Sequence, residues 1–351
     1  MKSIGFVLTK RAAVAALFSF LTVACGRQPV DLWTIEGEAM GTSYHVRIAD
    51  PPSGADREAA AAAVAGAVDR VNQLMSTYLE DSELSRLNRA PAGAPFEVSS
   101  ETLEVLTAAR RIGEASRGAL DVTVGPLVNA YGFGPDKSRR DPSDAEIERL
   151  RGIVGWDKIL LDEAARTIVK SAAAVYVDLS SVAKGYAVDR VFETLAQLGY
   201  VHHMSEIGGE VRAVGRNERG VAWRIAIERP IEQGREIERV LPIEDVALAT
   251  SGEYRNYYEG TSGRVSHTID PRIGRPISRP LGSVTVLAVN CLEADGWATA
   301  LNVLGPDEGF EVAVEQGLVA LFVTADEAGG FTEKATPAFE ARFGRTNQEA
   351  L

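Results

Sequence analysis

The chain has 351 residues, of which 45% are hydrophobic, and a formal net charge of −12. This length is ample for a buried core in one large domain or two smaller ones. The acidic balance argues against nucleic acid or an anionic lipid surface as a ligand. We therefore expect no nucleic-acid partner.

The start of the chain is predicted to be an export signal that takes no part in the fold. Lys2, Lys10 and Arg11 precede an apolar run over residues 12–24 that ends at Cys25, which is the arrangement of a secretory signal peptide. The run is shorter than the roughly 20 residues that a permanent transmembrane helix needs. Its removal takes three positive charges from the net charge of −12 and leaves −15.

Residues 21–25, Leu-Thr-Val-Ala-Cys, resemble the bacterial lipobox, in which the cysteine becomes the lipidated first residue of the mature protein. More than one acyl chain on Cys25 would anchor the protein stably. The leucine stands one position further from Cys25 than usual, and a plain signal peptide with an incidental cysteine is the alternative. We predict a lipoprotein signal peptide over residues 1–24, a lipid-attached tether over residues 25–33, and an exported protein held on a membrane facing the periplasm, in our interpretation the inner membrane.

The first half of the mature chain mixes a strand with helices. Alternating apolar and polar side chains predict a strand over Thr42–Ala49, and an alanine-rich run predicts a helix over residues 57–74. A second helix is expected over residues 100–116, with Ser100 as its N-cap. The Gly-, Pro- and charge-rich residues 132–142 are predicted to form a loop that could cover a site.

The second half continues this mixture. A short apolar run over residues 175–179 predicts a strand that leads directly into a helix ended by Gly199. Further strands are expected over residues 223–228, 282–289 and 317–324, and helices over residues 295–304 and 307–316. Because strands and helices do not alternate regularly, we expect an α+β fold with mixed, largely antiparallel sheets and packed helices. One compact catalytic unit is expected over residues 34–345.

Residues 178–189, Asp-Leu-Ser-Ser-Val-Ala-Lys-Gly-Tyr-Ala-Val-Asp, are the segment that is richest in candidate chemistry. They place backbone N–H groups, small residues and Lys184 at the start of a helix, and such a helix end attracts phosphate. An ordinary capped helix with a surface lysine has the same composition, so this segment alone leaves both interpretations open.

Asp295 and Thr299 stand four residues apart on a predicted helix. Their oxygens therefore lie on one side, one turn apart, and oxygen ligands suit a hard cation. Two ligands do not complete a site, so backbone carbonyls, water and ligand phosphate would supply the rest, as is usual for magnesium. A local hydrogen bond is the alternative.

Residues 266–272, Ser-His-Thr-Ile-Asp-Pro-Arg, combine a histidine, a carboxylate and a cation in a proline-bounded turn. This composition is typical of a loop that delivers a catalytic base. A His267 that is satisfied locally by Asp270 is the alternative, and no zinc-type ligand spacing accompanies it. Elsewhere, Met40 and Tyr78 could pack on a flat ring, although burial in a core is the usual fate of such side chains.

In this order, the segments resemble the FAD:protein FMN transferase (ApbE) family, from Met40 to about Gly305. The matching strings are Met40-Gly41-Thr42 and residues 75–78, 120–127, 178–189, 249–255, 266–271 and 294–301. The resemblance implies the T-fold-like architecture of that family. It also implies an enzyme that binds FAD and Mg²⁺ and transfers FMN through a phosphoester bond to a threonine or serine of an exported redox protein, with release of AMP.

The resemblance also assigns roles by position. The flavin nucleotide would be lined by Met40, Tyr78, Ala119, Leu120, Asp121, Ser180, Lys184 and Ile269. The cation would be held by Asp295, Thr299 and the carbonyl of Ala183. Lys184 would bind the pyrophosphate with the cation, and our hypothesis is that His267, helped by Asp270, takes the proton of the acceptor hydroxyl.

Two positions depart from the family pattern. Ala298 stands where some relatives have a further carboxylate ligand, and Ser181 stands where a glycine is typical. Two other functions remain open. If water replaces the protein hydroxyl, the same site is an FAD pyrophosphatase that gives FMN and AMP, and without catalysis the protein would be a flavin-binding lipoprotein. Finally, Cys291 lies in an apolar stretch and is expected to be packed rather than reactive.

Overall fold

The computed structural model describes residues 30–135, 138–231, 234–252, 257–260, 263–278, 281–325 and 330–344. The predicted signal peptide and Cys25 lie outside these ranges. Within them, no helix combines the length and the apolar composition that a membrane span requires.

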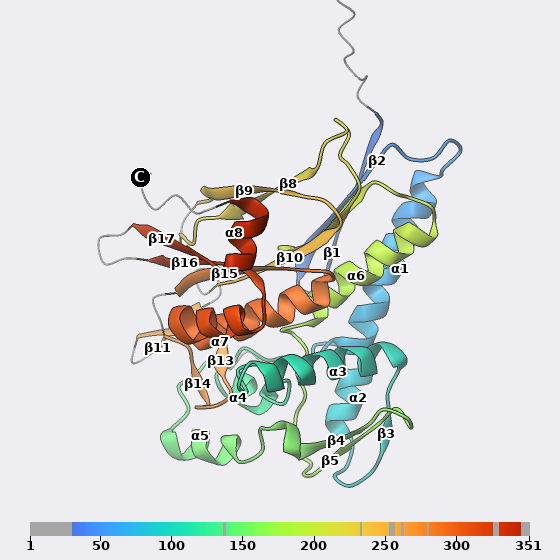
Figure 1. Cartoon of the computed structure of the whole chain (residues 1–351). Coiled ribbons are helices and arrows are strands. Elements are labelled where there is room, and N and C mark those ends of the chain that lie inside the picture. Colours follow the sequence, from blue (N-terminus) through green and yellow to red (C-terminus); the bar gives the residue numbers. More distant parts are fainter. Residues whose placement is uncertain are drawn as a thin grey trace, which may run out of the picture.

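A large antiparallel sheet forms the centre of the fold (Figure 1). In the described residues its strand order is β1 (Leu32–Ala39), β2 (Thr42–Ala49), β6 (His203–Ile207), β7 (Glu210–Val214), β10 (Val246–Gly252), β15 (Leu281–Ala288), β16 (Val319–Ala325) and β17 (Phe331–Ala335). The predicted alternation in β2 is confirmed, because Tyr44, Val46 and Ile48 are buried on one face while Arg47 is exposed. The expected α+β fold with largely antiparallel pairing is therefore confirmed.

Helices cover one face of this sheet and a hairpin with a short helix covers the other (Figure 1). The helices that lie against the first face are α1 (Arg57–Met75), α6 (Ala183–Gln197) and α7 (Cys291–Glu315), and α3 (Ser100–Ala115) packs on α7. The second face packs against β8 (Trp223–Glu228), β9 (Ile237–Ile243) and α8 (Pro337–Phe343). The apolar residues between α1, α6, α7 and the sheet form the main hydrophobic core.

Smaller elements complete the part of the molecule below α3 and α7 in Figure 1. They are α2 (Glu83–Arg89), β3 (Phe96–Glu97), α4 (Gly125–Ala130), α5 (Asp144–Arg151), a 3-10 turn at Trp156–Lys158, β4 (Ile159–Asp162), β5 (Thr167–Lys170), β11 (Tyr257–Gly260), β12 (Gly263–Ser266), β13 (Ile269–Asp270) and β14 (Arg275–Pro276). Leu127, Tyr131 and Ile147 are among the buried residues of a separate small core in this region.

The start of α3 differs from the sequence prediction by one residue. The predicted second helix is α3, but its N-cap is Ser99 rather than Ser100. The Ser99 side chain accepts a hydrogen bond from Thr102 N–H, and its own N–H and hydroxyl donate to the carboxylate of Glu83. This tertiary contact holds Ser99 in the extended conformation of a cap.

The predicted strand over residues 175–179 is wrong. The segment is extended, but its only described ladder contact is a single parallel bridge between Tyr176 and Val124. The side-chain amide of Asn88 takes the place of a neighbouring strand, because its Nδ2 donates to Val177 O (2.8 Å) and its Oδ1 accepts from Val177 N–H (2.7 Å). An apolar run alone does not show which group will satisfy its backbone.

Two other boundaries differ from the sequence prediction. Leu32 and Trp33, which we placed in the tether, already pair with Ala49 and Ile48 in the β1–β2 ladder. The two C-terminal helices predicted from residue 295 onward form one run, α7, which begins at Cys291 under the Asn290 cap. It is interrupted at Gly305 (φ 80°, ψ −175°), so a kink lies where the sequence predicts the boundary between two helices.

A buried lysine supports the segment that leads into the candidate site. Lys170 is 1% exposed, and its ammonium donates to the carbonyl oxygens of Asn88 (2.6 Å), Ala173 (3.1 Å) and Val175 (3.2 Å). Burial lowers the pKa of Lys170. The three hydrogen bonds offset part of this desolvation cost and fix the chain before Asp178.

Lys170→Met is expected to lower the free energy of unfolding by about 2–4 kcal/mol, because three buried carbonyl groups lose their donor. Urea denaturation measures the change. Lys158→Met is the matched control, since Lys158 pairs only with its neighbour, the exposed Asp157, among the contacts described for it, and a change within about 0.5 kcal/mol is expected. Equal stability of the two variants would show that Lys170 does not brace this segment.

Candidate functional site

The site is built where α6 and α7 cross near their N-termini. Asp295 of α7 accepts a hydrogen bond from Gly185 N–H of α6 (2.9 Å). In the other direction, Asp189 of α6 accepts from Cys291 N–H and Leu292 N–H of α7 (2.9 Å each). First-turn N–H groups have no acceptor within their own helix. Each helix therefore supplies a carboxylate to the free donors of the other.

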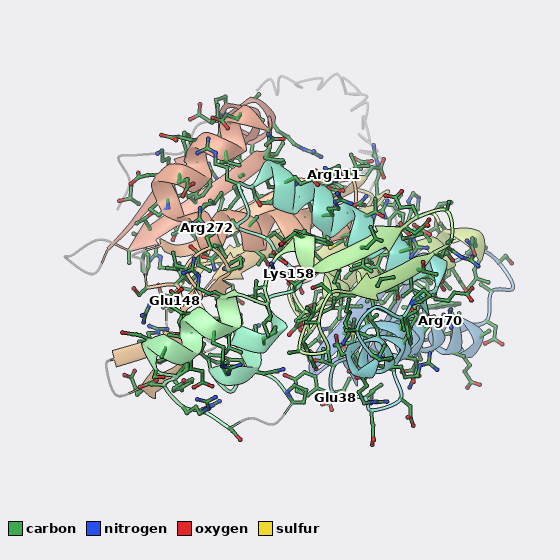
Figure 2. All side chains as sticks on the ribbon, turned by 90° about the horizontal axis from the view of Figure 1, so that it is seen from below. Glu38, Arg70, Arg111, Glu148, Lys158 and Arg272 are labelled. Carbon is green, nitrogen blue, oxygen red and sulfur yellow. The ribbon has the colours of Figure 1, made fainter. Side chains whose placement is uncertain are left out.

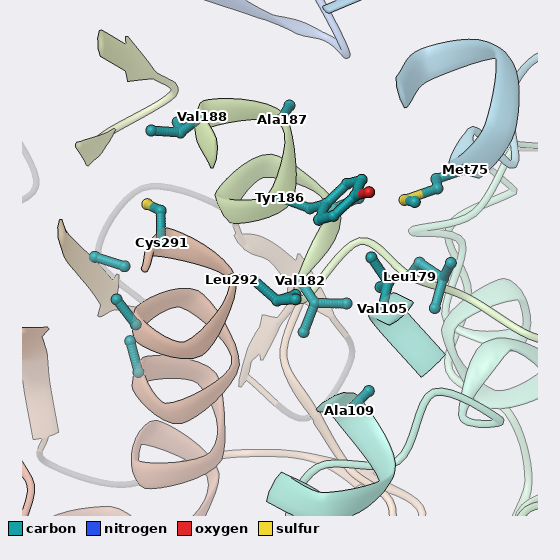
Figure 3. Close-up of a cluster of buried hydrophobic side chains, with 14 of the residues drawn as sticks. Met75, Val105, Ala109, Leu179, Val182, Tyr186, Ala187, Val188, Cys291 and Leu292 are labelled. Carbon is teal, nitrogen blue, oxygen red and sulfur yellow. The ribbon is translucent and has the colours of Figure 1, made fainter. Parts of the chain in front are cut away.

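This exchange requires the two backbones to approach closely. A Cβ on Gly185 would lie 2.3 Å from the Cys291 carbonyl oxygen and 2.7 Å from the Asp295 Cβ, so only glycine fits there. Figure 3 shows Val182 and Leu292 filling the neighbouring space between the two helices, and both are buried. Cys291 is fully buried as predicted.

Three charged side chains meet at this crossing. The Lys184 Nζ lies 2.6 Å from the Glu210 Oε1 of β7 and 3.9 Å from the Asp295 Oδ1. The carboxylate-bearing side chains are 5% and 6% exposed, whereas that of Lys184 is 29% exposed. We call Lys184, Glu210 and Asp295 the charged cluster.

With all three groups ionised, the charged cluster has one excess negative charge. Burial raises the pKa of Glu210 to about 8, although the Lys184 ammonium opposes the shift. Burial also raises the pKa of Asp295, against the effects of Lys184 and the Gly185 N–H. For Lys184, burial alone would lower the pKa, but the charges of Asp295 and Glu210 raise it, so this side chain stays protonated.

The charged cluster has the donor chemistry that a hard cation needs. The Glu210 Oε2 is buried without a hydrogen-bond partner, and a divalent cation would favour the ionised form of Glu210 by offsetting the excess negative charge of the fully ionised cluster. Among the described residues, no group of three or more His, Cys, Asp or Glu side chains could hold a metal ion. A cation would therefore need Asp295 together with backbone, hydroxyl or ligand oxygens, which is how magnesium is often bound. Ala183 is the first residue of α6, and Thr299 follows Asp295 by one turn of α7.

Two turns of the large sheet border the charged cluster. Gly208 has a φ of +63°, and a Cβ there would lie 3.0 Å from the Thr42 Cγ2 and 3.3 Å from the Lys184 Cδ. Met40 and Gly41 form the β1–β2 turn with φ values of 54° and 76°, the positive values of a two-residue hairpin turn. Thr42, directly after this turn, and Lys184 therefore both lie next to Gly208, and Met40 is two residues before Thr42.

The segment over residues 119–122 runs beside the start of the 178–189 motif. The Val122 carbonyl accepts from Asp178 N–H (2.7 Å), and Ser180 N–H donates to the Asp178 carboxylate (2.9 Å). Asp121 accepts from the N–H and hydroxyl of Thr123, and burial raises the pKa of Asp121. Ser180 is exposed and free to contact a ligand.

Three of the predicted flavin-lining residues have buried side chains. Ala119 and Leu120 are 2% exposed and belong to the main core, and Ile269 is 5% exposed and packs in the small core with Leu127. Their contribution to a flavin site would come from their backbone. Tyr78, by contrast, is 57% exposed.

Tyr78, a predicted flavin-lining residue, contacts the loop that follows α4. Its hydroxyl donates to the Phe133 carbonyl oxygen (3.0 Å). Partial desolvation of the hydroxyl, and then the negative charge of Asp178, raise the pKa of Tyr78. The Phe133 ring lies edge-on to His267, with centroids 6.3 Å apart and an interplanar angle of 69°. Tyr78 and His267 are therefore neighbours of the same residue.

The predicted pairing of Asp270 with His267 needs correction. Asp270 is 1% exposed and binds Arg272: its Oδ1 accepts from Arg272 N–H (2.9 Å) and its Oδ2 from the guanidinium (2.9 Å). An aspartate readily bonds the backbone two residues later, so local geometry favours Arg272. Arg272 also contacts Glu308 of α7, and Figure 2 shows it between α7 and the helix that carries Glu148. Asp270 thus anchors the His267 loop.

The structure brings together Lys184 and Asp295, with Ala183 directly before Lys184, and it places the segment over residues 119–122 beside the start of the 178–189 motif. Three contributors were not identified from sequence: Glu210, Asp189 and Phe133. Asp189 is the last residue of the 178–189 motif and Glu210 follows a glycine pair, but neither sequence pattern shows which groups the carboxylate contacts. Phe133 lies in the predicted loop, of which residues 136 and 137 are outside the described ranges.

Comparison with known proteins identifies the family of the chain. Residues 40–322 match the ApbE family. The FAD:protein FMN transferase of Vibrio cholerae is 43% identical over 330 residues, which cover 93% of this chain and 97% of that protein. The solved structure of flavin transferase ApbE from Vibrio cholerae has a TM-score of 0.82 at 41% identity, covering 90% of this chain and 100% of the other. The apo flavinyl transferase ApbE of Pseudomonas stutzeri has a TM-score of 0.82 at 36% identity, covering 90% and 98%. The chain belongs to the ApbE family.

Gly185→Ala is expected to lower the free energy of unfolding by about 1–3 kcal/mol, because the added methyl group forces α6 and α7 apart. Gly66→Ala provides the control within α1, where a Cβ would have no neighbour within 4 Å. This second change should be neutral or stabilise by up to about 1 kcal/mol. Chemical denaturation of both variants checks the prediction, and a Gly185→Ala protein as stable as the parent would contradict the close packing.

Proposed function

We propose that this chain is an FAD:protein FMN transferase that uses Mg²⁺ and a threonine or serine hydroxyl of an exported redox protein, and releases AMP. One observation carries the proposal: the predicted cation ligand Asp295 and the predicted phosphate ligand Lys184 lie at the same helix end, with Nζ and Oδ1 3.9 Å apart. Membership of the ApbE family and the names of the relatives support the same reaction.

The first turn of α6 and Lys184 would bind the pyrophosphate of FAD. Helix N-termini favour anions, and the ammonium of Lys184 is held in place by Glu210 and Asp295. Lys184 would stabilise the negative charge that develops on the departing AMP. The cost of burying the charged cluster is then offset when an anionic ligand and a cation complete it.

Asp295, Thr299 and the Ala183 carbonyl are the proposed cation ligands. When bound there, Mg²⁺ would offset phosphate charge and make the phosphorus more electrophilic. Asp295 also accepts the Gly185 N–H, so its side chain is oriented before any ligand arrives.

The reaction exchanges one P–O bond for another. The acceptor hydroxyl oxygen bonds to the phosphorus of the FMN half, and the bond from this phosphorus to the bridging oxygen breaks. The bridging oxygen leaves with the electron pair as part of AMP, and His267 takes the hydroxyl proton. The flavin ring would pack near Met40 and Tyr78, next to the loop that holds His267.

The transferase can be separated from its two alternatives with one assay. The protein is incubated with FAD, Mg²⁺ and the soluble domain of a redox protein that carries an acceptor threonine, with a Thr→Ala acceptor as control. Acid-stable fluorescence on the acceptor supports the transferase. Free FMN without labelled acceptor would support an FAD pyrophosphatase, and unchanged FAD would support a flavin-binding protein.

Asp295→Ala is expected to reduce turnover at least about 100-fold at millimolar Mg²⁺, because the acidic member of the three proposed cation ligands is lost. Asp295→Asn should have a similar effect while its amide oxygen can still accept the Gly185 N–H. Asp307→Ala, an exposed change on the same helix, serves as control and should retain full activity. Unaltered turnover of Asp295→Asn would remove the proposed cation site.

The export signal and the lipobox-like residues 21–25 support a lipoprotein anchored to a membrane that faces the periplasm. Cys25→Ser is expected to move the protein from the membrane fraction to the soluble fraction, because the acyl attachment point is lost. Cys291→Ala is the control, since Cys291 is buried. Fractionation of cells followed by immunoblotting measures both, and a Cys25→Ser protein that stays on membranes would count against the anchor.

A further inference from the structure

Phe133 contacts two side chains to which the proposed reaction gives different tasks. Its carbonyl oxygen accepts the Tyr78 hydroxyl (3.0 Å), and its ring lies edge-on to the His267 imidazole (6.3 Å between centroids, 69°). Tyr78 would hold the flavin, and His267 would accept the proton. The geometry points to Phe133 as a positioning residue that orients the His267 imidazole, an inference that rests on the proposed function.

The backbone of Phe133 is fixed by the end of α4. Gly132 has a φ of +77°, and its N–H donates to the Asn129 carbonyl (3.0 Å). The next N–H, that of Phe133, donates to the Val128 carbonyl (3.1 Å). This pair of bonds after a left-handed glycine is a Schellman-type helix end. The position of residue 133 is therefore set by the helix and not by its own side chain.

The ring of Phe133 is held from a second side by the β11–β12 hairpin. Tyr258 of β11 packs on it with centroids 5.4 Å apart, and the Tyr258 hydroxyl donates to the Arg140 carbonyl (3.0 Å). A Cβ on Gly132 would lie 2.5 Å from the Arg139 Cα, so the loop folds back on its own start. The Phe133 ring is thus a fixed surface next to a histidine that lies on a loop.

The two contacts of Phe133 come from different parts of the residue. The bond to Tyr78 uses the main-chain carbonyl, which any substitution retains, whereas the contact with His267 uses the ring. Removing the ring should therefore impair proton transfer and spare flavin binding. An edge-to-face aromatic contact biases side-chain orientation by about 3- to 10-fold. A general base that is held less often in the productive orientation transfers the proton more slowly by a similar factor.

The test compares Phe133→Leu, Phe133→Tyr and Phe331→Leu in the full mature protein. Phe331 is a partly buried phenylalanine of β17, packed in the second core cluster, and provides the matched control. The single-turnover rate of FMN transfer to the threonine-bearing acceptor should fall about 3- to 10-fold in Phe133→Leu only. The dissociation constant for FAD, from quenching of flavin fluorescence, should stay within about 2-fold. Phe133→Tyr keeps the ring and should restore the rate.

A double-mutant cycle with His267→Ala distinguishes the inference from the proposed function. If Phe133 acts through His267, Phe133→Leu should cause no further loss in the His267→Ala background. An equal further loss there, a parental rate in Phe133→Leu, or an FAD affinity that falls with the rate would each overturn the inference. Full activity of His267→Ala would instead remove the base assignment itself, and the inference with it.

Discussion

The exchange of carboxylates between the N-termini of α6 and α7 is the interaction on which the candidate site depends. Asp295 caps a donor of α6, and Asp189 caps two donors of α7. Both helices are thereby fixed in register where they cross. Without this register, Lys184 and Asp295 would belong to separate helix ends and could not act on one ligand. Gly185 permits the crossing, because any larger residue would meet the Cys291 carbonyl.

Burying the charged cluster without a bound ligand costs free energy of folding. Buried ion pairs seldom stabilise a fold relative to apolar packing, and the raised pKa of Glu210, about 8, shows that burial disfavours its ionised form. A cluster with two carboxylates and one ammonium is more readily explained as a binding site. A cation and a diphosphate would together supply the positive charge and the oxygen ligands that the protein leaves incomplete.

Local patterns predicted the parts of this site that are local in the chain. The helix start at Lys184 and the one-turn spacing of Asp295 and Thr299 follow from residue type and period. Glu210 could not be assigned in this way, because it lies beside Lys184 only when the β6–β7 hairpin is folded into the large sheet. Residues 175–179 are extended but do not form a strand, because side chains bind part of their backbone: Asn88 binds Val177, and Lys170 binds Val175. Asp270 was paired with His267 by proximity, whereas the turn geometry favours Arg272.

The two halves of the site differ in how they are supported. The side proposed to bind phosphate is built on helix ends and sheet turns, where the main core fixes the side chains. The side that carries Tyr78 and His267 is built on loops, which can adapt when a protein acceptor enters. A transferase needs both properties, because the pyrophosphate must be held rigidly while the hydroxyl is delivered by a second macromolecule. Loops gain the required accuracy only where a fixed residue packs against them, and Phe133, held by the end of α4 and in contact with both Tyr78 and His267, is in that position.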